Sequence, residues 1–87
     1  MLQNIYKYIV HFGLNEIVAP AGTTFLSFHK QGDTLVVYTR EYPKGYFNEA
    51  VHRIDVTFTG QGLCNHHDRY IGTVIDNDIT YHAFEVR

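Results

Sequence analysis

The sequence predicts an all-β protein: a single small antiparallel sheet or a partly closed sandwich of six to seven strands, with hairpins and little or no helix. Gly and Pro recur at short intervals and divide the chain into pieces of strand length. Residues 69–86 hold two runs rich in β-branched and aromatic residues around Asp76-Asn77-Asp78, the pattern of a β-hairpin. No window repeats apolar residues at helical spacing behind a cap.

The expected strands follow one another with short turns between them. Pro20-Ala21-Gly22 closes the second strand, and the compact turn Gln31-Gly32-Asp33 joins the third and fourth strands into a hairpin. A polar loop at residues 60–68 leads into the C-terminal hairpin. The expected strands cover residues 4–12, 15–19, 23–30, 34–42, 51–59 and the two arms of the hairpin at 69–86.

The run 51–59 has the cleanest alternation of apolar and polar residues in the chain. Such alternation is typical of an antiparallel strand with one face on the core and the other in water. His52 lies on the apolar face of this strand, where we expect a buried, hydrogen-bonded ring, and we expect the same of His82. Residues predicted to face inward are Ile54, Val56 and Phe58, and those predicted to face solvent are Arg53, Asp55 and Thr57.

Length and composition indicate one β domain over residues 1–87. The absence of an apolar run near ~20 residues, and of a signal-peptide pattern, predicts a protein that does not enter a membrane. A single cysteine, Cys64, excludes an internal disulfide, so cytoplasm is the expected compartment.

Charge and aromatic content bear on partners. The net charge is −2 and the seven basic residues are scattered, so duplex nucleic acid is not an expected partner. Seven Tyr and six Phe are a large aromatic content for a core this small. Tyr rings that do not fit inside a core are common at interfaces, so we expect a homo-oligomer, a dimer or higher.

Several segments resemble a known family in order and spacing over nearly the whole chain. They are Ile5-Tyr6-Lys7-Tyr8, Pro20-Ala21-Gly22, Phe25-Leu26-Ser27, Gly60-Gln61-Gly62, Tyr70-Ile71-Gly72-Thr73-Val74 and His82-Ala83-Phe84-Glu85. These segments are similar to a family of small phage and prophage proteins classed as a domain of unknown function. The resemblance implies a phage origin and a compact β fold, and it implies no activity. The family has His and Pro after Gly-x-Gly, where this chain has Leu63 and Cys64.

The run Cys64-Asn65-His66-His67-Asp68 places four potential metal ligands within five residues. Structural zinc sites usually draw two ligands from each of two separated segments, and no second pair is obvious. A solvated loop is therefore expected, with a metal site as the alternative. Cys64 would need a base such as His66, His67 or His82 to act as a nucleophile, and a small buried apolar residue is the expected role. The sequence thus predicts neither a metal, nor a cofactor, nor an enzyme.

Two loops are candidates for ligand binding. Gly60-Gln61-Gly62 can present backbone N–H groups to an anion, although it precedes no helix, and a bend after a strand is the alternative. Residues 42–48 expose Tyr and Phe rings around a lysine, which suits stacking or docking, and the alternative is that the rings cover a sheet edge. The predicted ligand-binding residues are Lys44, Tyr46, Phe47, Arg53, Gly60, Gln61, Gly62, His66, His67 and Arg69.

The favoured hypothesis is a phage counter-defence protein that sequesters a nucleotide-type immune second messenger without cleaving it. A few cations, backbone N–H groups and aromatic rings would suffice for such a ligand. The first alternative is a protein–protein inhibitor of a host defence effector, comparable to an anti-CRISPR blocker, and the second is a virion or assembly component. No paired carboxylates or catalytic triad stand out, which disfavours catalysis.

Overall fold

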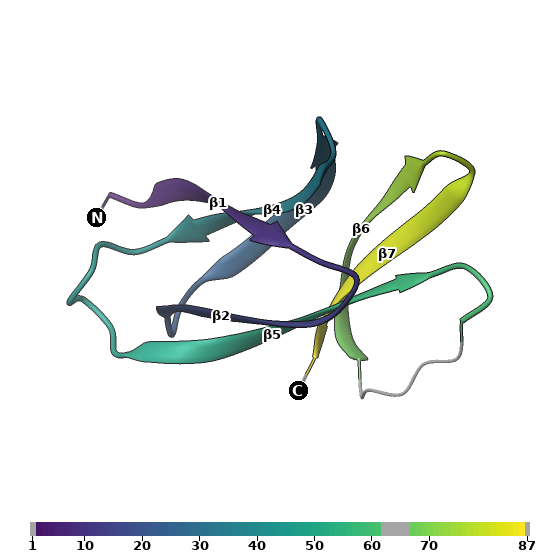
Figure 1. The fold of residues 1–87 in the computed structure, drawn as a ribbon. Helices are drawn as coiled ribbons and strands as arrows, with labels where there is room; N and C mark the ends of the chain where they lie inside the picture. The colour runs from purple at the N-terminus through teal and green to yellow at the C-terminus, as the bar shows by residue number, and fades with distance from the viewer. Residues whose placement is uncertain (1, 62–66, 87) are drawn as a thin grey trace.

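The protein is an antiparallel β-sandwich of two sheets, seen in a computed structural model that describes residues 2–61 and 67–86 (Figure 1). Seven strands and no helix are present in the described residues, which confirms the all-β prediction. Of the two expected arrangements, the sandwich is found rather than a single sheet. No helix long and apolar enough to cross a membrane occurs in the described part of the chain.

Each sheet is built from antiparallel pairs. The three-stranded sheet has the order β1-β4-β3 and the four-stranded sheet the order β2-β5-β7-β6. Strands β3 and β4 form the hairpin expected around Gly32, and the short run expected at 15–19 is an eight-residue strand. The strands are β1 (Asn4–Val10), β2 (Gly13–Pro20), β3 (Thr24–Gln31), β4 (Thr34–Glu41), β5 (Glu49–Phe58), β6 (His67–Asp76) and β7 (Ile79–Val86).

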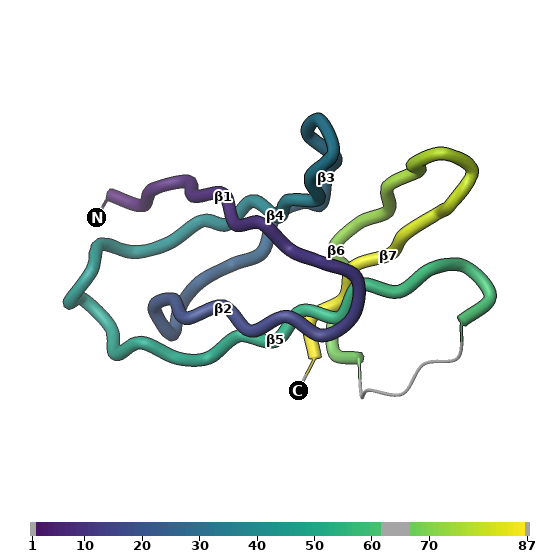
Figure 2. The backbone as a smooth tube through the Cα atoms, viewed as in Figure 1, coloured from purple at the N-terminus to yellow at the C-terminus, as the bar shows by residue number. Residues whose placement is uncertain are grey.

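The chain passes from one sheet to the other at a sharp corner between β1 and β2 (Figure 2). The strand expected over residues 4–12 therefore ends at Val10, and His11 and Phe12 form the corner. Gly13 adopts φ +96°, a conformation that glycine reaches without steric cost. The Asn15 side chain spans the corner: its Oδ1 accepts from the His11 backbone N at 2.8 Å, and its Nδ2 donates to the His11 carbonyl at 2.8 Å.

The two tight hairpin turns use the residues that their geometry requires. Asn77 and Asp78 have φ of 48° and 68°, the positive pair of a type I′ turn, whose twist matches that of the flanking strands. Gly32 has φ +59° at the first position of the two-residue turn between β3 and β4. Both turns therefore form where the sequence predicts them.

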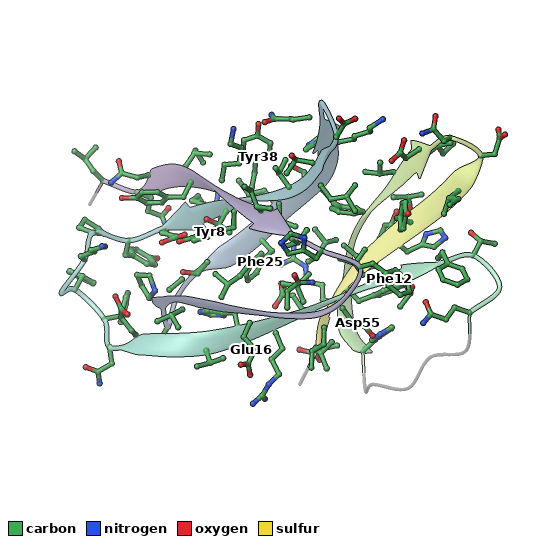
Figure 3. All side chains as sticks on the ribbon, viewed as in Figure 1. Tyr8, Phe12, Glu16, Phe25, Tyr38 and Asp55 are labelled. Carbon is green, nitrogen blue, oxygen red and sulfur yellow. The ribbon has the colours of Figure 1, made fainter. Side chains whose placement is uncertain are left out.

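The core lies between the two sheets. Figure 3 shows Phe25 between the layers, with Glu16 and Asp55 on the outer side of β2 and β5. One polar group is buried with its partners: the Glu41 carboxylate accepts hydrogen bonds from Tyr8 Oη at 2.7 Å and Thr39 Oγ1 at 2.6 Å. Burial, together with the Glu41 carboxylate, raises the pKa of the Tyr8 phenol. The buried apolar residues of the core are Val10, Ile17, Ala19, Phe25, Phe28, Val37, Ile54, Val56, Val74 and Ala83.

The burial predicted for β5 was wrong at three positions. Asp55 and Thr57 do lie on the face opposite Ile54, but their exposed fractions are only 5% and 4%. Rings of the neighbouring strands cover this outer face, because His67 bonds to Asp55 and His82 lies opposite Thr57. The prediction for Phe58 fails in the other direction, since the ring is 42% exposed where β5 runs past the end of the core.

The sheets approach closely where β6 passes β3. A Cβ on Gly72 would lie 3.1 Å from Phe28 Cβ and 3.3 Å from the Phe28 backbone N. Only glycine fits this contact without displacing backbone. The β6 strand also has two register shifts, next to His67 and next to Gly72, which let it bend towards the core.

Candidate functional site

The predicted aromatic loop forms a compact, half-exposed cluster. Tyr42, Tyr46 and Phe47 pack on one another, with ring centroids 4.9–5.8 Å apart, and the Tyr42 and Phe47 rings lie beside Gly22 of the turn between β2 and β3. Tyr46 remains 56% exposed. The rings thus pack over the turn at Gly22 and still present an aromatic surface beside Lys44, and stacking or docking there stays a prediction.

The other predicted ligand-binding residues lie elsewhere. Gly60 and Gln61 follow the far end of β5, while Gly62 and His66, with Cys64, lie outside the described residues. The ten-residue β5 strand separates this turn from the aromatic loop. At ~3.3 Å per residue, that distance is about 30 Å. Within one protomer the two predicted loops therefore do not line one site.

Two of the three predicted cations, Arg53 and Arg69, lie beside carboxylates, whereas Lys44 is exposed in the aromatic loop. Arg53 Nε lies 3.3 Å from Glu16 on the outer face of β2 and β5, and Arg69 lies 3.5 Å from Glu85. Burial raises the pKa of the Glu85 carboxyl, and the Arg69 charge opposes this rise. Neither arginine lines a cavity that the described residues form.

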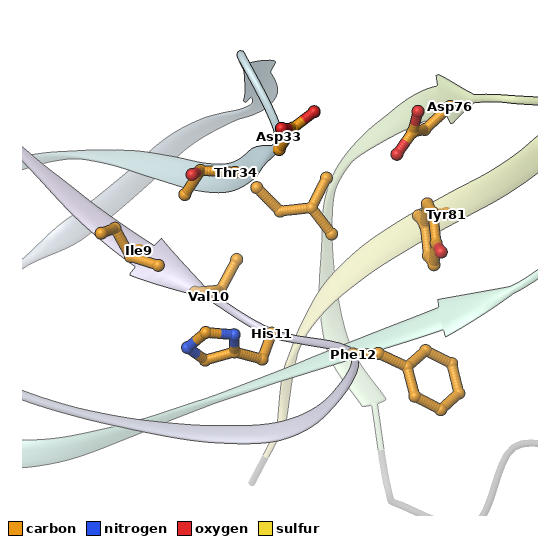
Figure 4. A pocket seen from close by; sticks show the side chains of 9 residues that line it. Ile9, Val10, His11, Phe12, Asp33, Thr34, Asp76 and Tyr81 are labelled. Atoms are coloured by element: carbon orange, nitrogen blue, oxygen red, sulfur yellow. The ribbon is translucent and has the colours of Figure 1, made fainter.

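A hollow surface lies at one end of the sandwich, where the β1–β2 corner faces the tips of two hairpins. One cavity of about 400 Å³ has an aliphatic floor and a polar rim of His11, Asp33 and Asp76 (Figure 4). A second cavity of about 360 Å³ shares the Phe12 and Tyr81 rings with the first. We call the pair the end groove. Its apolar lining consists of Ile9, Val10, Leu35, Phe12, Phe58, Ile79 and Tyr81.

The aromatic wall of the end groove is preassembled. Phe12 stacks on Phe58 with centroids 5.2 Å apart and meets Tyr81 edge-on at 6.5 Å. Phe12, Phe58 and Ile79 keep 51%, 42% and 45% of their surface exposed. Contiguous apolar surface of this kind, bordered by polar groups, is typical of interaction sites.

The rim of the end groove is acidic. Asp33 stands on the turn between β3 and β4, and Asp76 precedes the turn between β6 and β7. Lys30 bonds to Asp76 at 2.7 Å, and this hydrogen bond raises the pKa of the Lys30 ammonium. The Asp33 charge contributes to the same rise, so one lysine faces two rim carboxylates, and the remaining negative charge favours a cation on an apolar ligand.

A third cavity, of about 320 Å³, lies on the outer face of the four-stranded sheet at the turn after β5, and we call it the turn cavity. Three segments that carry the family resemblance meet around it. Its lining includes Gly60, Gln61, His82 and Phe84, and His82 bonds in turn to Thr73 of β6. The remaining lining residues are Thr57, Phe58 and Thr59.

Next to the turn cavity, His67 is held in a fixed position. Its Nε2 lies 2.9 Å from Asp55 Oδ2, its ring stacks on Phe84 at 4.2 Å, and the His67 and Asp55 side chains are almost fully buried. His67 thus belongs to β6 and not to the expected loop, and Asp68 shares that strand. The Nδ1 atom of His67 is buried without a hydrogen-bond partner among the described residues.

The described residues contain no cluster of three or more His, Cys, Asp or Glu that could hold a metal ion. The end groove has apolar rings and an acidic rim, and the turn cavity is lined by hydroxyl groups. Both surfaces are suited to binding. The end groove was not predicted from the sequence, because Phe12 and Tyr81 have the pattern of ordinary strand residues. The one available signal was Gly13, which breaks the alternation directly after Phe12 and marks the corner.

Comparison with known proteins gives a family and no activity. Neither the curated proteins nor the solved structures include a match to this sequence. The model of one family, described as a domain of unknown function (DUF7352), matches residues 1–87. The chain therefore belongs to the DUF7352 family.

Proposed function

We propose that this chain is a non-catalytic binding protein that docks onto a basic, apolar segment of another protein through the end groove. The observation that carries the proposal is the exposed ring wall of Phe12, Phe58 and Tyr81 beside the acidic rim. An aliphatic or aromatic side chain of the partner would pack against these rings, and a neighbouring Lys or Arg would form an ion pair with Asp33. Buried apolar anchors surrounded by polar contacts dominate the energy of most protein interfaces.

The charge distribution favours this function over nucleotide sequestration as predicted from the sequence. A nucleotide phosphate needs unengaged cations, whereas Arg53 and Arg69 both sit beside carboxylates and lie away from the cavities. Sequestration of a nucleotide-type messenger remains a prediction. A phage origin, also implied only by the resemblance, would make the docked protein a host defence effector in the host cytoplasm, with a virion partner as the alternative.

A displayed library of random peptides tests the proposal. The library would be sorted for binding to the purified chain, and the selected peptides would be measured against Ile79→Lys and a matched control, Ile5→Lys. Ile79 lines the end groove, whereas Ile5 is comparably exposed on β1 and lines none of the three cavities. Ile79→Lys places a cation on the apolar wall.

We expect the selected peptides to combine a large apolar residue with Lys or Arg. They should bind the wild type and Ile5→Lys equally, and bind Ile79→Lys at least tenfold more weakly, since a lost apolar anchor costs about 2 kcal/mol. Peptides without basic residues, or peptides that bind Ile79→Lys as well as wild type, would show that the end groove is not the docking site.

A further inference from the structure

The turn cavity is a second site that shares Phe58 with the end groove, and the rest of its lining points to a ligand of a different kind. Its wall includes the Phe84 ring, and its rim carries the hydroxyl of Thr59 and the imidazole of His82. An aromatic wall with a few fixed polar groups is the usual composition of a small-molecule site. At about 320 Å³ the cavity has room for one or two fused rings.

The aromatic wall is held rigidly before any ligand arrives. His67 stacks on Phe84 with an interplanar angle of 12°, and Tyr70 meets the same ring edge-on at 5.6 Å. His67 is itself fixed by Asp55, 2.9 Å away. The Phe84 side chain is therefore already ordered by folding. A ligand ring that stacks on it loses no affinity to the conformational entropy of ordering that side chain.

The polar rim is a chain of hydrogen bonds that can present either a donor or an acceptor. Tyr70 Oη bonds to Thr73 Oγ1, Thr73 bonds to His82 Nδ1 at 2.9 Å, and His82 Nε2 bonds to Thr59 Oγ1 at 2.8 Å. When Nε2 carries the proton, the Thr59 hydroxyl hydrogen is free to donate to a ligand. When Nδ1 carries the proton, Thr59 donates to Nε2 and its lone pairs accept.

The charge of its lining distinguishes this cavity from a typical phosphate-binding site. The described residues that line it include no lysine, arginine, aspartate or glutamate. Arg53, which lies on the same outer face, bonds to Glu16 of β2. The cavity therefore suits a neutral ligand with polar edges, because its described lining gives a phosphate group no lysine or arginine.

From this lining we infer that the turn cavity binds a planar nitrogen heterocycle of the nucleobase type, stacked on Phe84 and hydrogen-bonded at its edge by Thr59. A nucleobase has a flat face for the ring and alternating donors and acceptors for the Thr59–His82 pair. The Gln61 side chain stands at the same rim, where its Oε1 accepts from the Phe58 backbone N at 3.2 Å and its amide N–H groups make no hydrogen bond with the described residues.

Titration of the full, isotope-labelled chain with adenosine, guanosine, cytidine and uridine, followed by amide NMR, tests this inference. Ribose 5-phosphate serves as the control that carries sugar and phosphate without a base. We expect at least one nucleoside to shift the amides of Thr59, Gly60 and Phe84, and ribose 5-phosphate to leave them unchanged. Phe84→Leu should weaken binding by about 5- to 100-fold, the usual effect of removing an aromatic stacking partner.

Two further variants keep the test decisive. Thr59→Val keeps the shape of an exposed turn residue and removes only its hydroxyl, so it should weaken binding without affecting folding. Phe47→Leu, in the distant aromatic cluster, should bind like wild type. The inference is overturned if no nucleoside shifts these amides, if ribose 5-phosphate shifts them equally, or if Thr59→Val binds unchanged. Ile79→Lys should not alter nucleoside binding, so failure at the end groove and failure here are distinguishable.

Discussion

Asn15 holds the corner at which the chain changes sheets, and replacing it tests whether this corner sets the architecture. Its side chain bonds to the backbone N and carbonyl of His11, both at 2.8 Å, to the Gly13 carbonyl at 3.0 Å and to the Ile54 carbonyl at 3.3 Å. The corner residues His11 and Phe12 line the end groove. Asn15→Ala should therefore loosen both the fold and the proposed site.

The expected loss can be worked from these contacts. The amide has one acceptor and two N–H donors, so at most three of the four contacts are full hydrogen bonds at once. Each contributes about 0.5–1.5 kcal/mol net, and Asn15 is partly exposed, so water recovers some of the loss. Asn15→Ala should lower the free energy of unfolding by about 2–3 kcal/mol, or the melting temperature by about 10–20 °C in a domain of this size.

Urea unfolding followed by tyrosine fluorescence measures this change, because the chain has seven Tyr and no Trp. Asn48→Ala, an exposed asparagine whose side chain makes no hydrogen bond with the described residues, is the matched control and should cost less than ~0.5 kcal/mol. Asn15→Asp keeps the size but turns the donor into a carboxylate facing carbonyls, so it should also be destabilised at neutral pH. Wild-type stability in Asn15→Asp would refute the role of the donated bonds.

Three other changes have defined outcomes. Gly72→Ala should lower stability by about 1–3 kcal/mol in the same assay, because its methyl would crowd the Phe28 backbone, and an unchanged midpoint would contradict the close approach of β6 and β3. Tyr8→Phe should cost about 1–2 kcal/mol by removing a donor from buried Glu41. Burial raises the pKa of Glu85, so its ionisation opposes folding once the pH rises above its unfolded pKa of about 4.3. Glu85→Gln should therefore raise the melting temperature at pH ~7, and the gain should vanish below pH ~4.

The sequence was most informative where one residue type is required locally. Asn77 and Asp78 take positive φ in the predicted turn, and Gly32 does so in the other hairpin. Turn chemistry of this kind depends on neighbouring residues alone and so can be predicted without knowledge of the fold. The strand periodicity of β5 was also predicted correctly, because it too is local.

Burial and site geometry depended on contacts distant in sequence. Whether Asp55 is solvated is decided by His67, which reaches it from β6. The end groove exists because the chain turns at Phe12 and brings it against Phe58 and Tyr81, 46 and 69 positions further along the chain. No alternation pattern encodes where two sheets meet, so the end groove was missed, whereas Gly60 and Gln61, which were predicted from their turn, line the turn cavity.

The central claim is that the end groove docks a basic, apolar segment, and a charge exchange tests it most directly. Fluorescence anisotropy would measure a selected peptide and its Lys→Glu counterpart against the wild type and Asp33→Lys. We expect the original peptide to bind the wild type more tightly than Asp33→Lys. The Lys→Glu peptide should bind Asp33→Lys more tightly than the wild type. If Asp33→Lys changes both affinities equally, the acidic rim does not recognise the partner and the claim is wrong.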